Sequence, residues 1–200
     1  MKNKLTKLAL LSSSILMATA TFAADFPVTA SATAKWDATA VKDTQSILVV
    51  TPLKSLNFQY AEGLKAFNTQ TGAFDVTIEG QAGATDFQLT SQLISNTLTR
   101  GSDASTLNVG VAWNGTKLTK ATPTTLISTK NPMVSAGLDA LAQSSIYASS
   151  GRESAQGSFE FTIDDATSDG SAATDFSSLA DGMWNGEVAV QFTALWSDTP

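Results

Sequence analysis

The sequence predicts an all-β protein, built as a sandwich or a barrel. Two observations support this fold class. Short runs in which apolar and polar residues alternate recur along the chain, and this is the pattern of strands with one buried face. Turn-forming residues, mostly glycine, separate the runs. The length of 200 residues allows one domain with a sizeable core.

Residues 1–23 have the layout of a secretory signal peptide. Lysines give a positive start, an apolar stretch follows at residues 8–17, and Thr21-Phe22-Ala23 places small residues before a cleavage site. The apolar stretch is too short to span a bilayer. We therefore expect an exported protein that begins at Ala24 after cleavage.

Charge and composition exclude several classes of function. The signal segment contains three of the 12 basic residues and none of the 18 acidic ones, which leaves a formal charge of −9 on the mature chain. This charge disfavours nucleic acids and anionic membranes as partners. The sequence contains no histidine and no cysteine, so a Ser-His-Asp or Cys-His mechanism within one chain is impossible. We expect no enzyme and no cofactor.

The strand-like runs follow one another from end to end. We expect strands at residues 28–36, 46–50, 56–60, 74–78, 86–94, 107–113, 159–163 and 187–196. Asn114-Gly115 comes directly after one of these runs and predicts a hairpin. Arg100-Gly101-Ser102-Asp103 is typical of a polar turn.

Two segments carry a less regular pattern. Residues 136–147, "AGLDALAQSSIY", have apolar residues at helical spacing and are compatible with one short helix or with a loop packed on the sandwich. Residues 164–178, "DDATSDGSAATDFSS", are small, polar and acidic, and we expect a solvated loop there. The segment with Asp164, Asp165, Asp169 and Gly170 lacks the alternating oxygen ligands and the closing glutamate of a calcium loop. We therefore expect no metal site.

The four tryptophans do not indicate a sugar-binding platform. Trp36, Trp113 and Trp196 are in phase with the apolar faces of their runs, which favours the core. Trp184 stands between two glycines just before the last run. It is either a plug at a corner of the fold or an exposed aromatic side chain.

The two ends of the mature chain alternate most cleanly. One face of the first run consists of Val28, Ala30, Ala32, Ala34 and Trp36, and one face of the last run consists of Val188, Val190, Phe192, Ala194 and Trp196. Both runs are compatible with ordinary strands of a closed sandwich. However, a strand made largely of alanine gains little by burial against its own core, and Pro27 marks a strand start or an edge. This composition favours insertion into the sheet of a neighbour.

Several blocks of the sequence resemble a known family. They are "DTQSILVVTPLKSLNFQYAEGLKAFNTQTGAFDVTIEG" at 43–80, "LISNTLT" at 93–99, "STLNVGV" at 105–111 and "MWNGEVAVQFTALW" at 183–196. These blocks are similar to the major pilin of the common pilus, or Mat fimbria, in the alternate (alpha) chaperone–usher family. The absence of cysteine fits this resemblance, and the likeness is weakest over residues 123–154.

The resemblance implies an immunoglobulin-like β-sandwich that is incomplete, because its final strand is missing, and that carries an N-terminal donor-strand extension. The implied organisation is a signal peptide at 1–23, the extension at 24–36 and the pilin domain at 37–200. The face that begins at Val28 would be the donor strand, and the face that begins at Val188 would line the acceptor groove.

The resemblance also implies partners and a location. The partners would be other copies of the chain, a periplasmic chaperone, an outer-membrane usher and a tip subunit, without membrane insertion. The product would be a cell-surface fimbrium that supports adhesion to host cells and biofilm formation. The alternative is a stand-alone secreted β-sandwich that binds a carbohydrate or another surface ligand, with Trp184 as its candidate platform.

Overall fold

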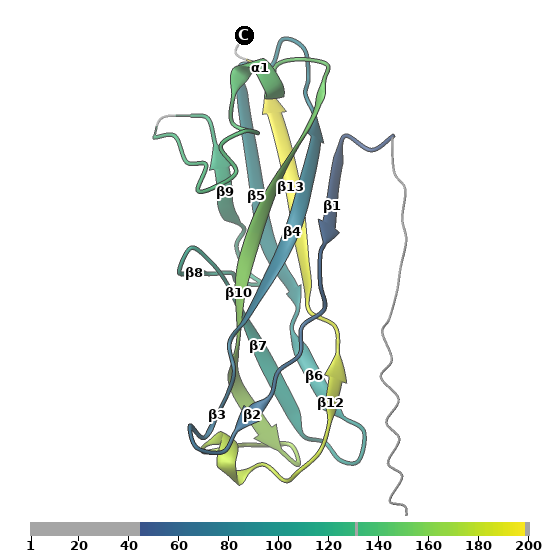
Figure 1. Ribbon diagram of the computed structural model, residues 1–200, viewed down its shortest axis with the longest axis vertical. Coiled ribbons are helices and arrows are strands. Elements are labelled where there is room, and N and C mark those ends of the chain that lie inside the picture. The colour runs from purple at the N-terminus through teal and green to yellow at the C-terminus, as the bar shows by residue number, and fades with distance from the viewer. Residues whose placement is uncertain (1–44, 131, 199–200) are drawn as a thin grey trace, which may run out of the picture. The chain divides into compact units, whose positions relative to one another are not determined.

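Strands form most of the structure, as the alternating pattern predicts (Figure 1). The computed structural model describes residues 45–130 and 132–198. The expected strand at 28–36, and with it Val28, Ala30, Ala32, Ala34 and Trp36, lies outside the described residues. The described residues all belong to one unit, Lys42–Pro200.

Two main sheets and one small hairpin make up this unit. The large sheet has the order β1 (Leu48–Pro52), β4 (Gln70–Glu79), β10 (Arg152–Ser168), β7 (Thr106–Trp113), β6 (Thr97–Arg100) and β12 (Trp184–Gly186), with β11 (Ser171–Ala172) paired to β10 and β8 (Thr116–Lys117) paired to β7. The three-stranded sheet has the order β13 (Ala189–Ser197), β5 (Asp86–Ser95) and β9 (Thr124–Ser128). The hairpin pairs β2 (Tyr60–Ala61) with β3 (Ala66–Phe67).

The inner faces of the two main sheets pack on each other. Phe74 on β4 and Phe159 on β10 come from the large sheet, and both rings contact the ring of Phe192 on β13. The inward residues of β4, β5, β7 and the second half of β10 are buried, including Val76, Leu89 and Val109, which are fully inaccessible. The prediction of an all-β sandwich is therefore confirmed.

The hairpin predicted at Asn114-Gly115 is confirmed. These two residues connect β7 to β8, and both have positive φ angles, 46° and 80°. A two-residue loop of this conformation matches the right-handed twist of its strands, and asparagine and glycine adopt it at low cost. A second expectation, a strand at 56–60, was wrong. Only Tyr60 enters a strand, while Leu56 and Phe58 pack on the core from a segment outside the strands.

The acidic segment at 164–178 is not the solvated loop that its composition suggested. β10 continues to Ser168 and turns at Asp169-Gly170 into β11, and a short 3-10 helix follows at Phe176–Ser178. A strand forms here because Ala166 is buried and the carboxylates face outward. Asp164 pairs with Lys117 at 2.8 Å, and Asp165 accepts a hydrogen bond from Asn108 at 2.7 Å.

The segment at 136–147 is a loop packed on the sandwich. It consists of turns that end in the single helical turn α1 (Ser144–Tyr147). Leu138 and Leu141 are fully inaccessible, which explains their helical spacing without a long helix. No helix in the described parts of the chain is both long and apolar enough to cross a membrane.

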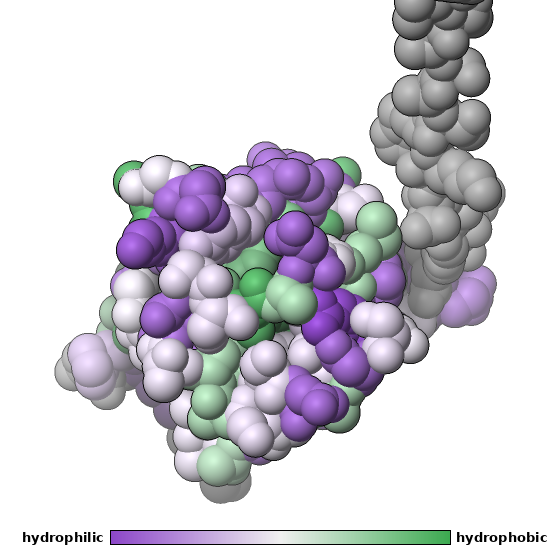
Figure 2. All heavy atoms as spheres, turned by 90° about the horizontal axis from the view of Figure 1, so that it is seen from below, coloured by the Kyte–Doolittle hydropathy of each residue, from purple (hydrophilic) through white to green (hydrophobic). Residues whose placement is uncertain are grey.

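Aromatic side chains also gather at the end of the molecule that carries the β2–β3 hairpin. The ring of Phe67 lies 5.5 Å from those of Tyr60 and Phe176 and 6.5 Å from that of Trp184. Figure 2 shows this end from below, with apolar side chains in the middle of a mostly hydrophilic face. These contacts join the small hairpin to the segment that leads into β12.

Candidate functional site: the open edge of β13

The last strand of the chain has a partner on one side only. β13 pairs with β5 from Ala189 to Ser197, and no other strand in the described residues pairs with it. A strand at a sheet edge leaves a row of backbone N–H and C=O groups without strand partners, which makes it a template for another chain. We call the unpaired side of β13 the open edge.

The side chains of β13 alternate as the sequence predicts. Val188, just before the strand, and Val190, Phe192, Ala194 and Trp196 within it all pack against the core. The residues between them, Gln191, Thr193 and Leu195, are exposed. The structure thus brings the five predicted residues of the last run onto one face.

The inward face of β13 is less well covered than that of its neighbour. All five inward residues are only partly buried, whereas Phe87, Leu89, Ser91 and Leu93 on β5 are buried. The exposed fraction of Leu93 is 5% and that of Leu89 is zero. Apolar surface is therefore left accessible along the open edge. Leu48 and Val50 on β1, the edge strand beside β4, are partly buried in the same way.

Aromatic rings fill the space between the sheets next to β13. The ring of Phe192 lies 5.1 Å from that of Phe74 and 5.8 Å from that of Phe159. Trp113 contacts the same pair of rings from β7. A Cβ atom placed on Gly157 would lie only 2.7 Å from the Phe74 ring. Because the layer is already full, there is little room for large side chains from an added strand.

One end of the open edge is a corner where two paired strands change sheet together. β5 leads into β6 through Asn96, and β12 leads into β13 through Glu187 and Val188. The Ser95 hydroxyl donates a hydrogen bond to the Glu187 carbonyl oxygen at 3.3 Å, which links the two crossings. We call residues 95–96 and 187–188 the corner. A straight strand that joins β13 in its sheet must leave that sheet or bend at this point.

A family model described as "Fimbrillin MatB" matches residues 29–196. The chain belongs to this family. It is 52% identical to the common pilus major fimbrillin subunit EcpA of Klebsiella pneumoniae (strain 342), over 98% of this chain and 100% of that protein. It is 54% identical to the same-named subunit of Escherichia coli O139:H28 (strain E24377A / ETEC), over 85% of this chain and 87% of that protein.

Among solved structures, the CooA pilin subunit from enterotoxigenic Escherichia coli matches the chain with a TM-score of 0.47 and 19% identity, over 76% of this chain and 90% of that chain. The fimbrillin family consists of structural subunits of extracellular pili, not of enzymes. The expectations of a pilin and of a protein without enzymatic activity are therefore confirmed.

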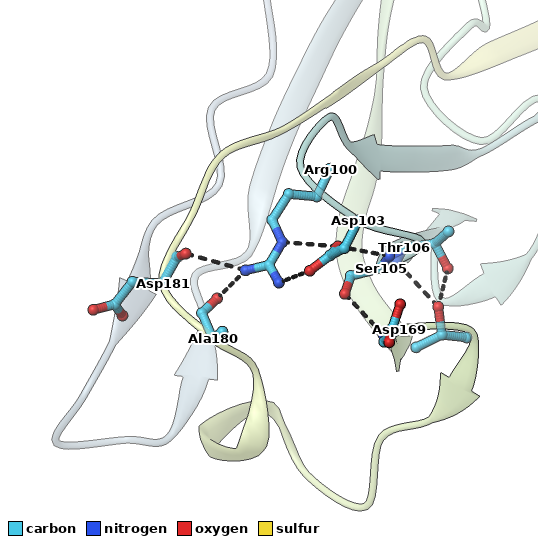
Figure 3. Close-up of polar contacts among 8 residues, drawn as sticks. Arg100, Asp103, Ser105, Thr106, Asp169, Ala180 and Asp181 are labelled. Atoms are coloured by element: carbon cyan, nitrogen blue, oxygen red, sulfur yellow. Dashed lines mark hydrogen bonds and ion pairs between the residues drawn. The ribbon is translucent and has the colours of Figure 1, made fainter.

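The fimbrillin holds the start of β12 with a buried arginine (Figure 3). Arg100 Nη1 donates to the carbonyl oxygens of Ala180 at 2.6 Å and Asp181 at 3.1 Å. Its Nε donates to Asp103 Oδ1 at 3.0 Å, and Nη2 pairs with Asp103 Oδ2. The guanidinium carbon lies 5.2 Å from the centre of the Trp184 ring. We call this set of contacts the clasp.

The electrostatics of the clasp follow from its hydrogen bonds. The Arg100 side chain is only 8% exposed, and an arginine is rarely so buried unless it is paired. The hydrogen bond from Arg100, followed by that from the backbone N–H of Ser105, holds the pKa of Asp103 well below its usual range. The hydrogen bond with Asp103 also raises the pKa of Arg100. Both groups are therefore charged over the ordinary pH range.

Trp184 in this fimbrillin is a plug rather than a platform. Its ring is partly buried between the Arg100 guanidinium and Phe67. It also begins β12, opposite Arg100 on β6. The alternative of an exposed aromatic side chain at this position is wrong, and the stand-alone binding module loses its candidate platform.

Sequence reasoning missed the clasp. It treated residues 100–103 as a polar turn, and the Arg100 backbone does enter a turn, with its N–H donating to the Ser105 carbonyl oxygen. Asp103 lies within this turn, but the two carbonyl oxygens that the side chain also binds lie some 80 positions further along the chain. A lone arginine beside a glycine-containing turn carries no local signal of such a contact. Gly182 is the one sequence feature that fits this contact. A Cβ atom at this position would lie 2.6 Å from Arg100 Cδ, so a glycine lets the segment pack closely on the arginine.

Proposed function

We propose that this fimbrillin is the major subunit of a chaperone–usher pilus and polymerises by donor-strand exchange. In this proposal, residues 28–36 of one copy pair with the open edge of β13 in the next copy. The observation that carries the proposal is the open edge itself. Within the described residues, β13 has one strand partner and an inward face that is only partly buried, whereas the inward residues of β5, its neighbour, are buried.

The composition of the extension suits this site. Its inward face offers Val28 and three alanines before Trp36, and these small side chains suit the filled aromatic layer around Phe192. The nine residues of β13 also match the length of segment 28–36. A shift by one residue would turn Thr29, Ser31, Thr33 and Lys35 inward, so the alternation specifies the face.

The energetics favour a persistent fibre. Each backbone hydrogen bond along the added strand contributes about 0.5–1.5 kcal/mol net, and burial of the accessible apolar face adds to this. Because the donating and accepting surfaces differ, the contact is head-to-tail, and it produces a filament when the rotation between successive copies does not close a ring. Dissociation requires the whole strand to leave, so the fibre is stabilised kinetically as well.

The same open edge explains the need for other partners. An unpaired edge with accessible apolar residues is an aggregation hazard before assembly. We infer that the signal peptide directs the chain to the periplasm, where a chaperone lends a strand to β13. The usher in the outer membrane then exchanges this strand for the extension of the next subunit, behind a tip subunit. The resulting surface fimbrium supports adhesion to host cells and biofilm formation.

The test is Ala32→Asp, with Thr33→Asp as the matched control on the opposite face of the extension. We expect Ala32→Asp to abolish fibres seen by negative-stain electron microscopy and heat-resistant ladders on gels, because it brings a charge against the aromatic layer. Thr33→Asp should assemble. Normal fibres from Ala32→Asp would overturn the proposal.

A second experiment separates assembly from folding. A chain that begins near Thr39 lacks the extension and should be stabilised by an added peptide of residues 27–36. The same peptide with Ala32→Asp should not stabilise it. A truncated chain that is equally stable with and without the peptide would contradict an incomplete sandwich.

A further inference from the structure

The open edge ends at the corner, and the clasp holds the strand that leads into it. β13 begins at Ala189, only two residues after β12 ends at Gly186. β12 has three residues, and in the part of the chain that the structure describes its sheet partner is β6 alone. So short a strand is held weakly by backbone pairing, and the side-chain contacts of Arg100 supplement it.

The clasp gathers three segments of the chain at this point. Arg100 holds residues 180–184 through two carbonyl oxygens and the Trp184 ring. Asp103 accepts hydrogen bonds from Arg100 and from the Ser105 backbone at 2.9 Å. The Ser105 hydroxyl in turn accepts a hydrogen bond from the Asp169 backbone N–H at 3.0 Å, in the β10–β11 turn (Figure 3). The start of β12 is therefore tied to the rest of the large sheet.

We propose that Arg100 is a positioning residue of the open edge: by fixing β12, and through it the corner, the clasp sets the register in which the incoming strand pairs with β13. This inference rests on the proposed donor-strand function and adds a residue that controls it. Arg100 acts by holding the segment at which pairing with the three-stranded sheet must end.

The register follows from the geometry. Every strand pairing in the described residues is antiparallel, and we take the incoming strand to be antiparallel to β13 as well. In the proposed pairing the donor segment ends at the corner, which would set Trp36 opposite Val188 and Val28 opposite Trp196. The outward residue Ser31 then lies opposite Thr193. If the corner moves, the strand slides toward it and Ser31 comes opposite Gln191.

The chain has no cysteine, so paired cysteines report this register without interference. One preparation carries Ser31→Cys, and the other carries Thr193→Cys, Gln191→Cys or Leu195→Cys. Each pair is mixed, polymerised and oxidised, and disulfide-linked dimers are measured on non-reducing gels. Antiparallel neighbours lie within disulfide reach only when they are directly opposite. We expect the Thr193→Cys partner to give the main dimer.

The same mixtures are then made with Arg100→Met, which keeps the apolar stem but removes the hydrogen-bond donors. We expect the main dimer to shift from Thr193→Cys to Gln191→Cys. Gly182→Ala in the accepting copy should cause the same shift, because its Cβ atom pushes residues 180–184 away from Arg100 while the ion pair remains. Arg100→Lys, which keeps the charge, should shift less than Arg100→Met.

The outcomes separate this inference from the proposed function. If the mixtures form no fibres and none of the three partners gives an intermolecular dimer, donor-strand exchange itself is overturned. A main dimer at Thr193→Cys that is unchanged by Arg100→Met and Gly182→Ala would overturn only the role of Arg100. If both clasp variants lose near-ultraviolet circular dichroism and cannot assemble, the clasp is a determinant of folding and the register proposal is wrong.

Discussion

The ring of Phe192 on β13 lies 5.1 Å from the ring of Phe74 on β4, at an interplanar angle of 64°. Phe74 is 4% exposed, whereas Phe192 is only partly buried. One aromatic contact therefore joins the sealed core of the sandwich to the strand with the open edge. Any strand added beside β13 would cover Phe192, so occupancy of the edge and packing of the core are coupled.

This coupling gives the first prediction, for Phe192→Ala. Removal of a fully buried phenylalanine costs about 3–5 kcal/mol, and a partly buried one costs less. We expect a modest loss in the free energy of unfolding for the free subunit and a larger loss when a peptide of residues 27–36 fills the edge. Urea unfolding with and without the peptide measures both values. Thr193→Ala, at the exposed neighbour, is the control, and an equal loss from Phe192→Ala in both states would contradict the coupling.

The aromatic layer also predicts a large effect of Gly157→Ala. The added Cβ atom would lie 2.7 Å from the Phe74 ring and 3.1 Å from the Trp113 ring, so the rings must shift. Overpacking of a tight core costs about 1–3 kcal/mol. Gly151→Ala, just before the same strand, meets its nearest atom at 3.4 Å and is the control. Urea unfolding at neutral pH should separate the two variants, and equal stabilities would show that the layer has room.

The sequence predicted the last strand well because alternation is a local property. A period of two in the sequence predicts one common face for Val190, Phe192, Ala194 and Trp196. Which edge of which sheet stays open is not local, because it depends on strand order. Only the composition of the N-terminal run and the family resemblance pointed to it.

Composition misled the sequence analysis at residues 164–178. Small polar residues are typical of loops. The end of a long strand can have the same composition when most of its side chains are exposed. Ala166 was the one residue in the strand part of this segment that signalled an inward position. Arg100 was missed for a different reason, because its role depends on contacts with residues 180–184, far along the chain. Spacing rules apply within one element and do not report such contacts.

The β7–β8 hairpin predicts a cost for Gly115→Ala that comes from the backbone alone. Gly115 has φ of +80°, and no atom lies within 4 Å of an added Cβ. A left-handed conformation costs a residue with a Cβ atom about 1–2 kcal/mol. Gly63→Ala is the matched control, because that site is equally open but has no positive φ. We expect a lower melting temperature for Gly115→Ala only, and equal values would contradict the turn conformation.

Asp103 predicts a dependence of stability on pH. Its pKa is lowered by the hydrogen bonds from Arg100 and the Ser105 backbone, whereas in the unfolded chain it is about 3.9. A carboxylate whose pKa is lower in the folded state stabilises the fold above the unfolded pKa, and this contribution is lost as the pH falls toward the folded pKa. We expect Asp103→Asn to lower the free energy of unfolding by a constant amount between about pH 7 and pH 5, and by progressively less below about pH 4. Urea unfolding across this range gives the difference from the wild type.

Asp181→Asn is the control for this measurement, because Asp181 meets Arg100 through its carbonyl oxygen and not through its carboxylate (Figure 3). It should lower the free energy of unfolding at pH 7 by less than Asp103→Asn does, because it keeps the contact with Arg100. The Asp169 charge also acts on Arg100, so Asp169→Asn should weaken the clasp less than Asp103→Asn does. A deficit for Asp103→Asn that stayed the same down to pH 2 would mean that the carboxylate acts through its shape and not through its charge, and the electrostatic account of the clasp would be wrong.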